Sequence, residues 1–208
     1  MVRVKICGIR DLESALAAVE AGAHAVGFVF ADSPRRVEPA TVRRIALNLP
    51  PFVSKVGVFV NAPRKEVEEI ADYCGLDTLQ FHGQEPPEYC AGWRYAVIKA
   101  FRVKDRSFLQ EMSGYRVSAC LLDACVPGKA GGTGVRCDWE LAREAAVLGP
   151  VILAGGINRE NVEEAIRTVR PFAIDVSSGV ESGGRKDPQK IRSLLAEVRR
   201  IEYELTGS

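Results

Sequence analysis

The feature that most constrains the fold of this chain is a regular alternation of two kinds of segment. Short runs rich in β-branched residues are each followed by a stretch in which apolar residues recur at helical spacing, and the pair repeats eight times. Strands are predicted at residues 2–7, 25–30, 53–59, 78–81, 96–100, 119–122, 151–154 and 173–176. Helices are predicted at residues 11–21, 39–47, 64–74, 87–91, 103–113, 138–146, 159–169 and 188–204.

Residues that favour helix starts support several of these boundaries. Pro39 and Pro63 suit the first turn of the second and third helices. Asn158 suits the N-cap of the seventh helix, and Asp187 followed by Pro188 suits the start of the last.

Strict alternation implies parallel strands joined by helical crossovers. Eight such units favour closure into one α/β domain over residues 1–208, a (β/α)8 or TIM barrel more compact than the usual size of about 250 residues. The main alternative is a doubly wound open sheet, which would need a glycine-rich fingerprint after the first strand. The first strand here ends in Cys7-Gly8-Ile9-Arg10, without that pattern, so the barrel is preferred.

The charge balance narrows the possible partners. With 28 basic and 27 acidic side chains the formal net charge is +1, which gives no general attraction to nucleic acid or to an anionic membrane surface. No run approaches the roughly 20 apolar residues of a membrane span, and Arg3 and Lys5 interrupt the apolar residues at the N-terminus. A cytoplasmic protein with a small-molecule partner is expected.

The six cysteines form no CxxC pair, and most are expected to be free thiols that pack as small apolar side chains. The two histidines are far apart in sequence and there is no HExxH pattern, so no metal site is predicted. His24, before the second strand, is expected to be structural.

In a barrel of this kind the functional face lies at the carboxyl ends of the strands. Side-chain alternation places Lys5 and Cys7 on one face of the first strand and the apolar Val4 and Ile6 on the other. The apolar face should meet the helices, which turns Cys7 toward the barrel mouth. Nearby cations lower the pKa of a thiol, and Lys5 is a plausible one, so Cys7 is a candidate base. A buried packing cysteine is the alternative.

Polar residues also end the fourth and sixth strands. Asp123 directly follows an apolar strand, where a carboxyl group is costly to bury without partners, and desolvation would make it a candidate general acid. A loop or capping aspartate is the alternative. Gln80 and His82 share a face of the fourth strand and offer polar contacts to a substrate, although His82 also fits a plain loop histidine.

Several loops at the same face suit an anion. Arg35 and Arg36 follow the second strand, and guanidinium groups bind carboxylate or phosphate in a bidentate manner, although a solvated arginine pair is the common alternative. The loops after strands seven and eight are a frequent phosphate site of this fold. Their small residues let backbone N–H groups approach an anion, or simply make tight turns. These phosphate-site candidates are Gly155, Gly156, Ser177, Ser178 and Gly179.

The glycine-rich segment 128–134 follows the sixth strand and lacks the order of a Walker phosphate loop. It is interpreted as a mobile loop that closes over substrate.

These segments together resemble one enzyme family. The resemblance runs from residue 2 to about residue 200, and its motifs are KICGIR at 5–10, GFVF at 27–30, SPR at 33–35, VGVFVN at 56–61, QFHGQE at 80–85, LLDA at 121–124, GGTG at 131–134, LAGGIN at 153–158 and DVSSGVES at 175–182. The pairing of KICG with DVSSGVE is typical of phosphoribosylanthranilate isomerases of tryptophan biosynthesis, and the chain is similar to that family.

The resemblance implies an isomerase that converts N-(5′-phosphoribosyl)anthranilate to 1-(2-carboxyphenylamino)-1-deoxy-D-ribulose 5-phosphate, an Amadori rearrangement without a cofactor. By motif position, Asp123 is the general acid that protonates the furanose ring oxygen, and Cys7 is the base that removes the C2′ proton. Arg36 matches the contact to the anthranilate carboxylate, with Asp175 nearby, although the paired Arg35 leaves that assignment open. The backbone at the phosphate-site candidates would hold the phosphate. The oligomeric state is left as monomer or homodimer.

Two rival functions stand beside this one. Another phosphate-binding barrel isomerase is disfavoured, because histidine-pathway enzymes of this fold resemble a two-aspartate design and Cys7 stands where one aspartate would be. Sugar-phosphate epimerases need metal-ligating histidines, which are scarce here. A barrel that binds a phosphorylated ligand without turning it over is disfavoured by the intact pair of Cys7 and Asp123.

Overall fold

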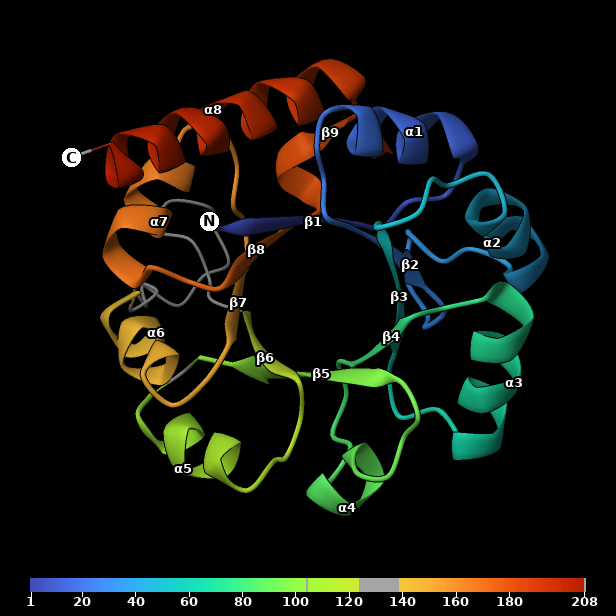
Figure 1. Ribbon diagram of the computed structural model, residues 1–208. Helices are drawn as coiled ribbons and strands as arrows, with labels where there is room; N and C mark the ends of the chain where they lie inside the picture. Colours follow the sequence, from blue (N-terminus) through green and yellow to red (C-terminus); the bar gives the residue numbers. More distant parts are fainter. Residues whose placement is uncertain (104, 124–138, 208) are drawn as a thin grey trace.

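The computed structural model describes residues 1–103, 105–123 and 139–207. The strands β1 to β8 close into a parallel barrel in which each strand pairs with the next along the chain and β8 pairs with β1, as Figure 1 shows. Their bounds are β1 (Arg3–Cys7), β2 (Ala25–Val29), β3 (Ser54–Phe59), β4 (Thr78–Phe81), β5 (Ala96–Arg102), β6 (Ala119–Asp123), β7 (Val151–Ala154) and β8 (Ala173–Val176). The predicted barrel is therefore confirmed.

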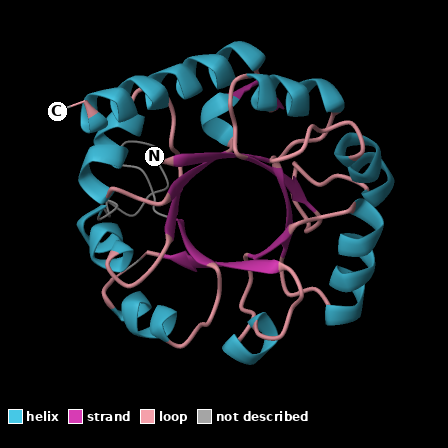
Figure 2. Cartoon of the chain, viewed as in Figure 1, coloured by secondary structure: helices cyan, strands magenta, loops and turns pink. Residues whose placement is uncertain are grey.

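The helices form a ring outside the strands (Figure 2). Their bounds are α1 (Leu12–Glu20), α2 (Pro39–Ala46), α3 (Arg64–Cys74), α4 (Pro87–Cys90), α5 (Ser107–Ser113), α6 (Trp139–Ala146), α7 (Val162–Val169) and α8 (Pro188–Thr206). No described helix is long and apolar enough to cross a bilayer.

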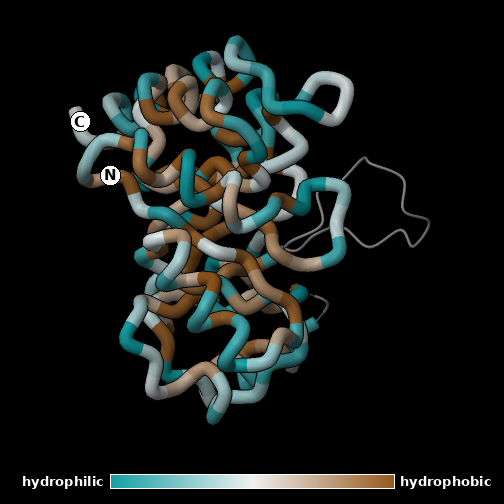
Figure 3. The backbone as a smooth tube through the Cα atoms, turned by 90° about the vertical axis from the view of Figure 1, so that its right-hand side faces the viewer, coloured by the Kyte–Doolittle hydropathy of each residue, from teal (hydrophilic) through white to brown (hydrophobic). Residues whose placement is uncertain are grey.

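The core has two layers, which follow from side-chain alternation along the strands. The larger layer lies between strands and helices and includes Val4, Ile6 and Phe28. A smaller cluster fills the barrel interior: Val56, Ile98, Ala100, Ala119, Leu121, Ile152, Ala154 and Ala173. The hydrophobic stretches accordingly gather toward the middle of the molecule in Figure 3.

Most predicted boundaries agree with the structure, but α7 begins later than expected. Its N-cap position is taken by Asn161, and the prediction of Asn158 was wrong. The Asn158 side chain instead accepts hydrogen bonds from the backbone N–H groups of Glu160 and Asn161, which makes a separate turn before the helix. The N-cap Asp187 of α8 is confirmed, since its carboxylate accepts from the N–H groups of Gln189 and Lys190.

Two further features differ from the prediction. The helix expected from residue 103 begins at Ser107. After β8 the chain forms a 3₁₀ turn (Ser178–Val180) and a small hairpin, β9 (Glu181–Ser182) and β10 (Arg185–Lys186), none of which was predicted. The expected start of α6 at 138 and the segment 128–134 lie outside the described residues.

Candidate active site

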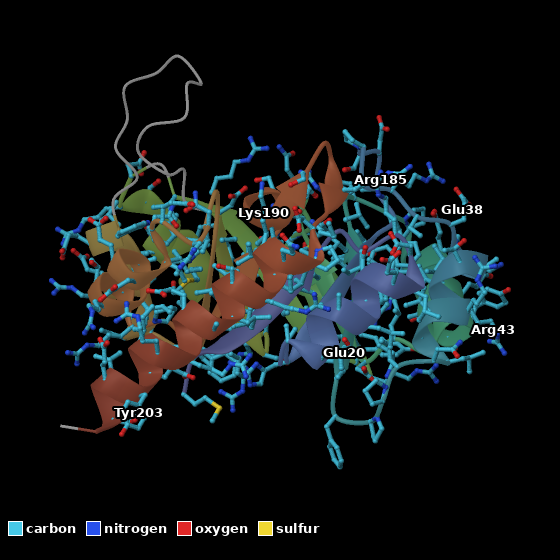
Figure 4. The ribbon with its side chains drawn as sticks, turned by 90° about the horizontal axis from the view of Figure 1, so that it is seen from above. Glu20, Glu38, Arg43, Arg185, Lys190 and Tyr203 are labelled. Atoms are coloured by element: carbon cyan, nitrogen blue, oxygen red, sulfur yellow. The ribbon has the colours of Figure 1, made fainter. Side chains whose placement is uncertain are left out.

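A cavity of about 460 Å³ opens at the carboxyl ends of the strands and brings most of the predicted site residues together. Its predicted members are Cys7, Gln80, His82, Asp123, Gly155, Gly156, Asp175, Ser177 and Ser178. In Figure 4, Arg185 of the β9–β10 hairpin and Glu38 before α2 both lie at the upper right of the view.

Cys7 lies on the interior face of β1, as the alternation of the strand predicted. Its thiol is buried and lines the cavity, and Lys5 is buried one layer below. Gly27 of the neighbouring β2 makes room for both side chains. A Cβ atom at Gly27 would lie 2.8 Å from Cys7 Sγ and 3.0 Å from Lys5 Cε, which is closer than van der Waals contact allows. We call Lys5, Cys7 and Asp175 the thiol side of the cavity.

An ion pair crosses from β1 to β8 beneath the thiol. Lys5 and Asp175 are paired in the register of the two strands, and Lys5 Nζ donates to Asp175 Oδ1 at 2.9 Å. Burial alone would lower the pKa of Lys5, but the charge of Asp175 and the thiol of Cys7 raise it above its usual value. Lys5 is therefore a permanent cation below the thiol.

The pKa of Cys7 is raised, although the sequence led us to expect nearby cations to lower it. Burial of the thiol is the largest cause, and the negative charge of Asp175 adds to it. Lys5 and Lys186 act in the opposite direction without cancelling these effects. The resting thiol is therefore protonated, and a thiolate formed there is a stronger base than that of an exposed cysteine.

A second charged cluster, the Arg35–Glu181–Lys186 network, lies beside the thiol side and was not predicted. Arg35 binds Glu181 through two hydrogen bonds of 2.7 Å, and Lys186 Nζ donates to Glu181 Oε1 at 2.7 Å. The Arg35 guanidinium is the main reason that the pKa of Glu181 falls to about 2. Lys186 is buried, which lowers its pKa despite the carboxylate beside it.

This network is joined to the phosphate-site candidates and to β1. Lys186 Nζ also donates to the backbone oxygen of Ser177 at 3.0 Å and to its Oγ at 3.2 Å. Ser177 Oγ in turn donates to the backbone oxygen of Cys7 at 3.1 Å. The loop after β8 is thus held to the end of the strand that carries the thiol.

Across the cavity, Gln80, His82 and Asp123 form what we call the carboxyl side. Gln80 Nε2 lies 3.0 Å from His82 Nδ1, and His82 Nε2 lies 3.7 Å from Asp123 Oδ2. The side chains of His82 and Asp123 are 31% and 41% exposed, so this side is more open than the thiol side. The sequence analysis expected Asp123 to be desolvated. The described residues bury its side chain only partly.

The two candidate arginines are placed differently. Arg35 borders the cavity, but its guanidinium is bound to Glu181. The side chain of Arg36 is 58% exposed, and its Nε lies 3.8 Å from Glu38 Oε1. Arg36 is not among the residues that line the cavity. Its backbone is bridged to Val29 at the end of β2. Arg36 is thus at the rim, with a guanidinium that a ligand carboxylate can reach without breaking a buried ion pair.

The loops after β7 and β8 pack against each other. Gly155 and Gly156 have φ of 89° and 66°, a region that favours glycine. A Cβ atom at Gly179 would lie 1.9 Å from the backbone oxygen of Ile157, so only glycine permits this approach. Gly179 itself supports the cavity wall, whereas Gly156 and Ser178 line it. The contact brings two glycine-bearing backbones to one end of the cavity.

Within the described ranges, the structure has no group of three or more histidine, cysteine or acidic side chains that could hold a metal ion. Cys7, Cys74, Cys90 and Cys120 are free thiols, as expected. Cys125 and Cys137 lie outside the described residues.

Comparisons with known proteins point to one family. The family model described as N-(5′-phosphoribosyl)anthranilate (PRA) isomerase matches residues 4–197. A protein of Moorella thermoacetica named N-(5′-phosphoribosyl)anthranilate isomerase is 57% identical over 204 residues, which are 97% of this chain and 92% of that protein.

Solved structures agree with this match. The phosphoribosyl anthranilate isomerase of Thermotoga maritima is 45% identical with a TM-score of 0.88, covering 96% of this chain and 100% of its own. A second isomerase structure, in complex with reduced 1-(o-carboxyphenylamino)-1-deoxyribulose 5-phosphate, is 43% identical with a TM-score of 0.86 and the same coverage.

Proposed function

The chain belongs to the N-(5′-phosphoribosyl)anthranilate isomerase family of tryptophan biosynthesis, and we propose that Cys7 and Asp123 carry out its reaction as general base and general acid. The substrate would be N-(5′-phosphoribosyl)anthranilate and the product 1-(2-carboxyphenylamino)-1-deoxy-D-ribulose 5-phosphate, formed by an Amadori rearrangement. The observation that carries the proposal is that thiol and carboxyl group line one cavity beside the loops after β7 and β8.

The first step opens the ribose ring. Asp123 gives its proton to the furanose ring oxygen, the C1′–O4′ bond breaks, and the nitrogen lone pair forms a C1′=N Schiff base. The partial exposure of Asp123 supports this role, because the carboxyl group can take up a proton again after each turnover.

The second step moves a proton from carbon. The Cys7 thiol first gives its proton to solvent in the cavity that it lines, and the thiolate then removes the C2′ proton. The electron pair of the broken C2′–H bond forms a C1′=C2′ double bond, and the Schiff base becomes an enolamine. The enolamine then takes a proton at C1′ and loses the C2′ hydroxyl proton to become the ketone. Lys5 lies below Cys7 and Lys186 acts on the thiol electrostatically, so both cations stabilise the thiolate needed here.

The remaining predicted residues would bind the two anionic ends of the substrate and the ribose between them. Arg36 at the rim is suited to the anthranilate carboxylate, and backbone N–H groups near Gly156 and Ser178 to the phosphate. Gln80, His82 and Asp175 line the space between. These steps move protons only, so we propose that no cofactor takes part, and that the reaction runs in the cytoplasm.

The test follows the loss of phosphoribosylanthranilate fluorescence with purified protein and with Cys7→Ala and Asp123→Asn. Each variant should lose about 10²–10⁴-fold in kcat, the usual contribution of one acid or base. Cys120→Ala and Asp77→Asn are matched controls outside the cavity lining and should keep wild-type turnover. Unchanged turnover in Cys7→Ala or Asp123→Asn would remove that residue from its role.

A further inference from the structure

We propose that Gln80 is a positioning residue that fixes His82 as the Nε2–H tautomer, so that a neutral hydrogen-bond donor faces Asp123. The inference deepens the proposed function, because it rests on Asp123 acting as the acid. It starts from one buried amide on β4, which the resemblance to the family leaves without an assigned role.

The amide of Gln80 has little freedom to move. Gln80 is only 1% exposed. Its strand β4 is paired on both sides, and Val58 of β3 and Ile98 of β5 lie opposite Gln80 in the register. Its Nε2 lies 3.0 Å from His82 Nδ1. An amide nitrogen only donates hydrogen bonds, so Nδ1 must accept and the proton of the neutral imidazole must sit on Nε2.

That proton faces Asp123. His82 Nε2 lies 3.7 Å from Asp123 Oδ2, a separation that a small side-chain movement would close to a hydrogen bond. A neutral Nε2–H orients the carboxyl group of Asp123 without forming an ion pair with it. An imidazolium in the same place would hold the carboxylate as an anion and oppose its reprotonation.

The other end of the amide faces the reaction space. Gln80 Oε1 is buried and has no hydrogen-bond partner among the described residues, and Gln80 lines the cavity that holds Cys7 and Asp123. A buried acceptor left without a donor is unfavourable. A hydroxyl group of the substrate ribose is the donor that fits. Gln80 would then contact the substrate through its own Oε1 and contact His82 through its own Nε2.

The direct test is ¹⁵N nuclear magnetic resonance of the ring nitrogens in the full-length protein without ligand, at about pH 8, where free imidazole is neutral. The chain has two histidines, so His24 serves as an internal reference. Its Nδ1 accepts the Val4 N–H at 3.2 Å, which sets the same Nε2–H tautomer. We expect His82 to match His24. A His82 signal with the proton on Nδ1 overturns the proposal.

Two variants extend the test. In Gln80→Met the His82 tautomers should become mixed, with both kcat and kcat/KM about tenfold lower and a higher KM. Gln80→Glu keeps an acceptor for the substrate but cannot donate, so His82 should shift to Nδ1–H and kcat should fall by a similar factor while KM stays near wild type. His24 should be unchanged in both.

A His82 tautomer that is the same in both variants as in wild type overturns the proposal, because something other than Gln80 then sets it. If either variant fails to fold, the wild-type spectrum alone decides. If the tautomer is as expected while Asp123→Asn keeps full turnover, the acid role of Asp123 fails and the Gln80–His82 arrangement stands without it.

Discussion

The two sides of the cavity are built in opposite ways. On the thiol side, Lys5 and Asp175 form a buried ion pair, and the Arg35–Glu181–Lys186 network packs beside it. On the carboxyl side, one hydrogen bond joins the buried amide of Gln80 to His82, whose Nε2 lies 3.7 Å from the partly exposed carboxyl group of Asp123. In the proposed reaction, proton abstraction from carbon falls to the buried, charged side, and proton exchange with solvent falls to the more open side.

The contrast has a consequence for stability. Removing one partner of a buried ion pair lowers the free energy of unfolding strongly, whereas removing an exposed polar contact lowers it little. Substitutions on the thiol side should therefore damage both folding and catalysis, and those of the partly exposed His82 and Asp123 catalysis alone.

The largest effect is expected from Lys5→Met, which leaves Asp175 as an unpaired buried carboxylate. The free energy of unfolding should fall by about 3–5 kcal/mol, measured by urea denaturation. The matched control is Lys55→Met, which breaks an ion pair of the same 2.9 Å length with Asp77 at a more exposed position. That control should cost about 1 kcal/mol or less. Equal losses in the two variants would remove the contrast.

A smaller effect is expected from Gly27→Ala. The new methyl group would lie 2.8 Å from Cys7 Sγ, 3.0 Å from Lys5 Cε and 3.2 Å from the backbone Cα of Cys7, all of them buried, so the free energy of unfolding should fall by about 1–3 kcal/mol. Because the added methyl group displaces the thiol itself, kcat should also fall, even under conditions where the variant is fully folded. Gly149→Ala, where nothing lies within 4 Å of the added Cβ, is the control for a glycine without such neighbours. Wild-type kcat in Gly27→Ala would show that the thiol does not depend on this space.

The third prediction concerns Glu181→Gln, whose effect on stability should change with pH only in acid. The pKa of Glu181 is lowered from 4.5 to about 2, so its ionisation stabilises the folded state above about pH 4.5, and this contribution is lost as the pH falls toward 2. In Glu181→Gln the difference in unfolding free energy from wild type should be constant above that window and shrink within it. Glu163→Gln removes an exposed partner of Arg167 and Arg200, which also lower the pKa of Glu163; because solvent screens these pairs, it should change the acid unfolding curve much less. A parallel pair of curves for wild type and Glu181→Gln down to pH 2 would contradict the assignment.

The smallest effect on stability is expected from Asp123→Asn and His82→Ala. Both side chains are partly exposed and neither is part of a buried ion pair among the described residues, so the free energy of unfolding should stay within about 0.5 kcal/mol of wild type. Asp123→Asn should nevertheless lose most of its turnover. A destabilisation as large as that of Lys5→Met would mean that the carboxyl side is a structural element too.

Much of the fold and part of the site followed from local patterns. The period of two along β1 placed Lys5 and Cys7 inside the barrel, and the position of Asp123 at the end of an apolar run placed it at the mouth. Gly27 carried a signal that was not used, since a glycine inside a predicted strand often marks a close approach.

Other features have no local signature. The β9–β10 hairpin has strands of two residues, too short for any periodicity, so Glu181 and Lys186 could not be assigned to a buried network. The direction of the Cys7 pKa depends on how deeply the thiol is buried and on Asp175, which is 168 positions away in the chain but adjacent in space. Tertiary packing decided both.

In the proposed complex, the hydrogen bond from Ser177 to the backbone of Cys7 would couple the binding of the substrate phosphate to the position of the thiol at the reacting carbon. Binding energy gained far from the reacting carbon can then be used to settle the thiol against C2′. A dephosphorylated analogue should for this reason be a slow substrate even at saturation, and free inorganic phosphate supplied alongside it should restore part of the lost rate.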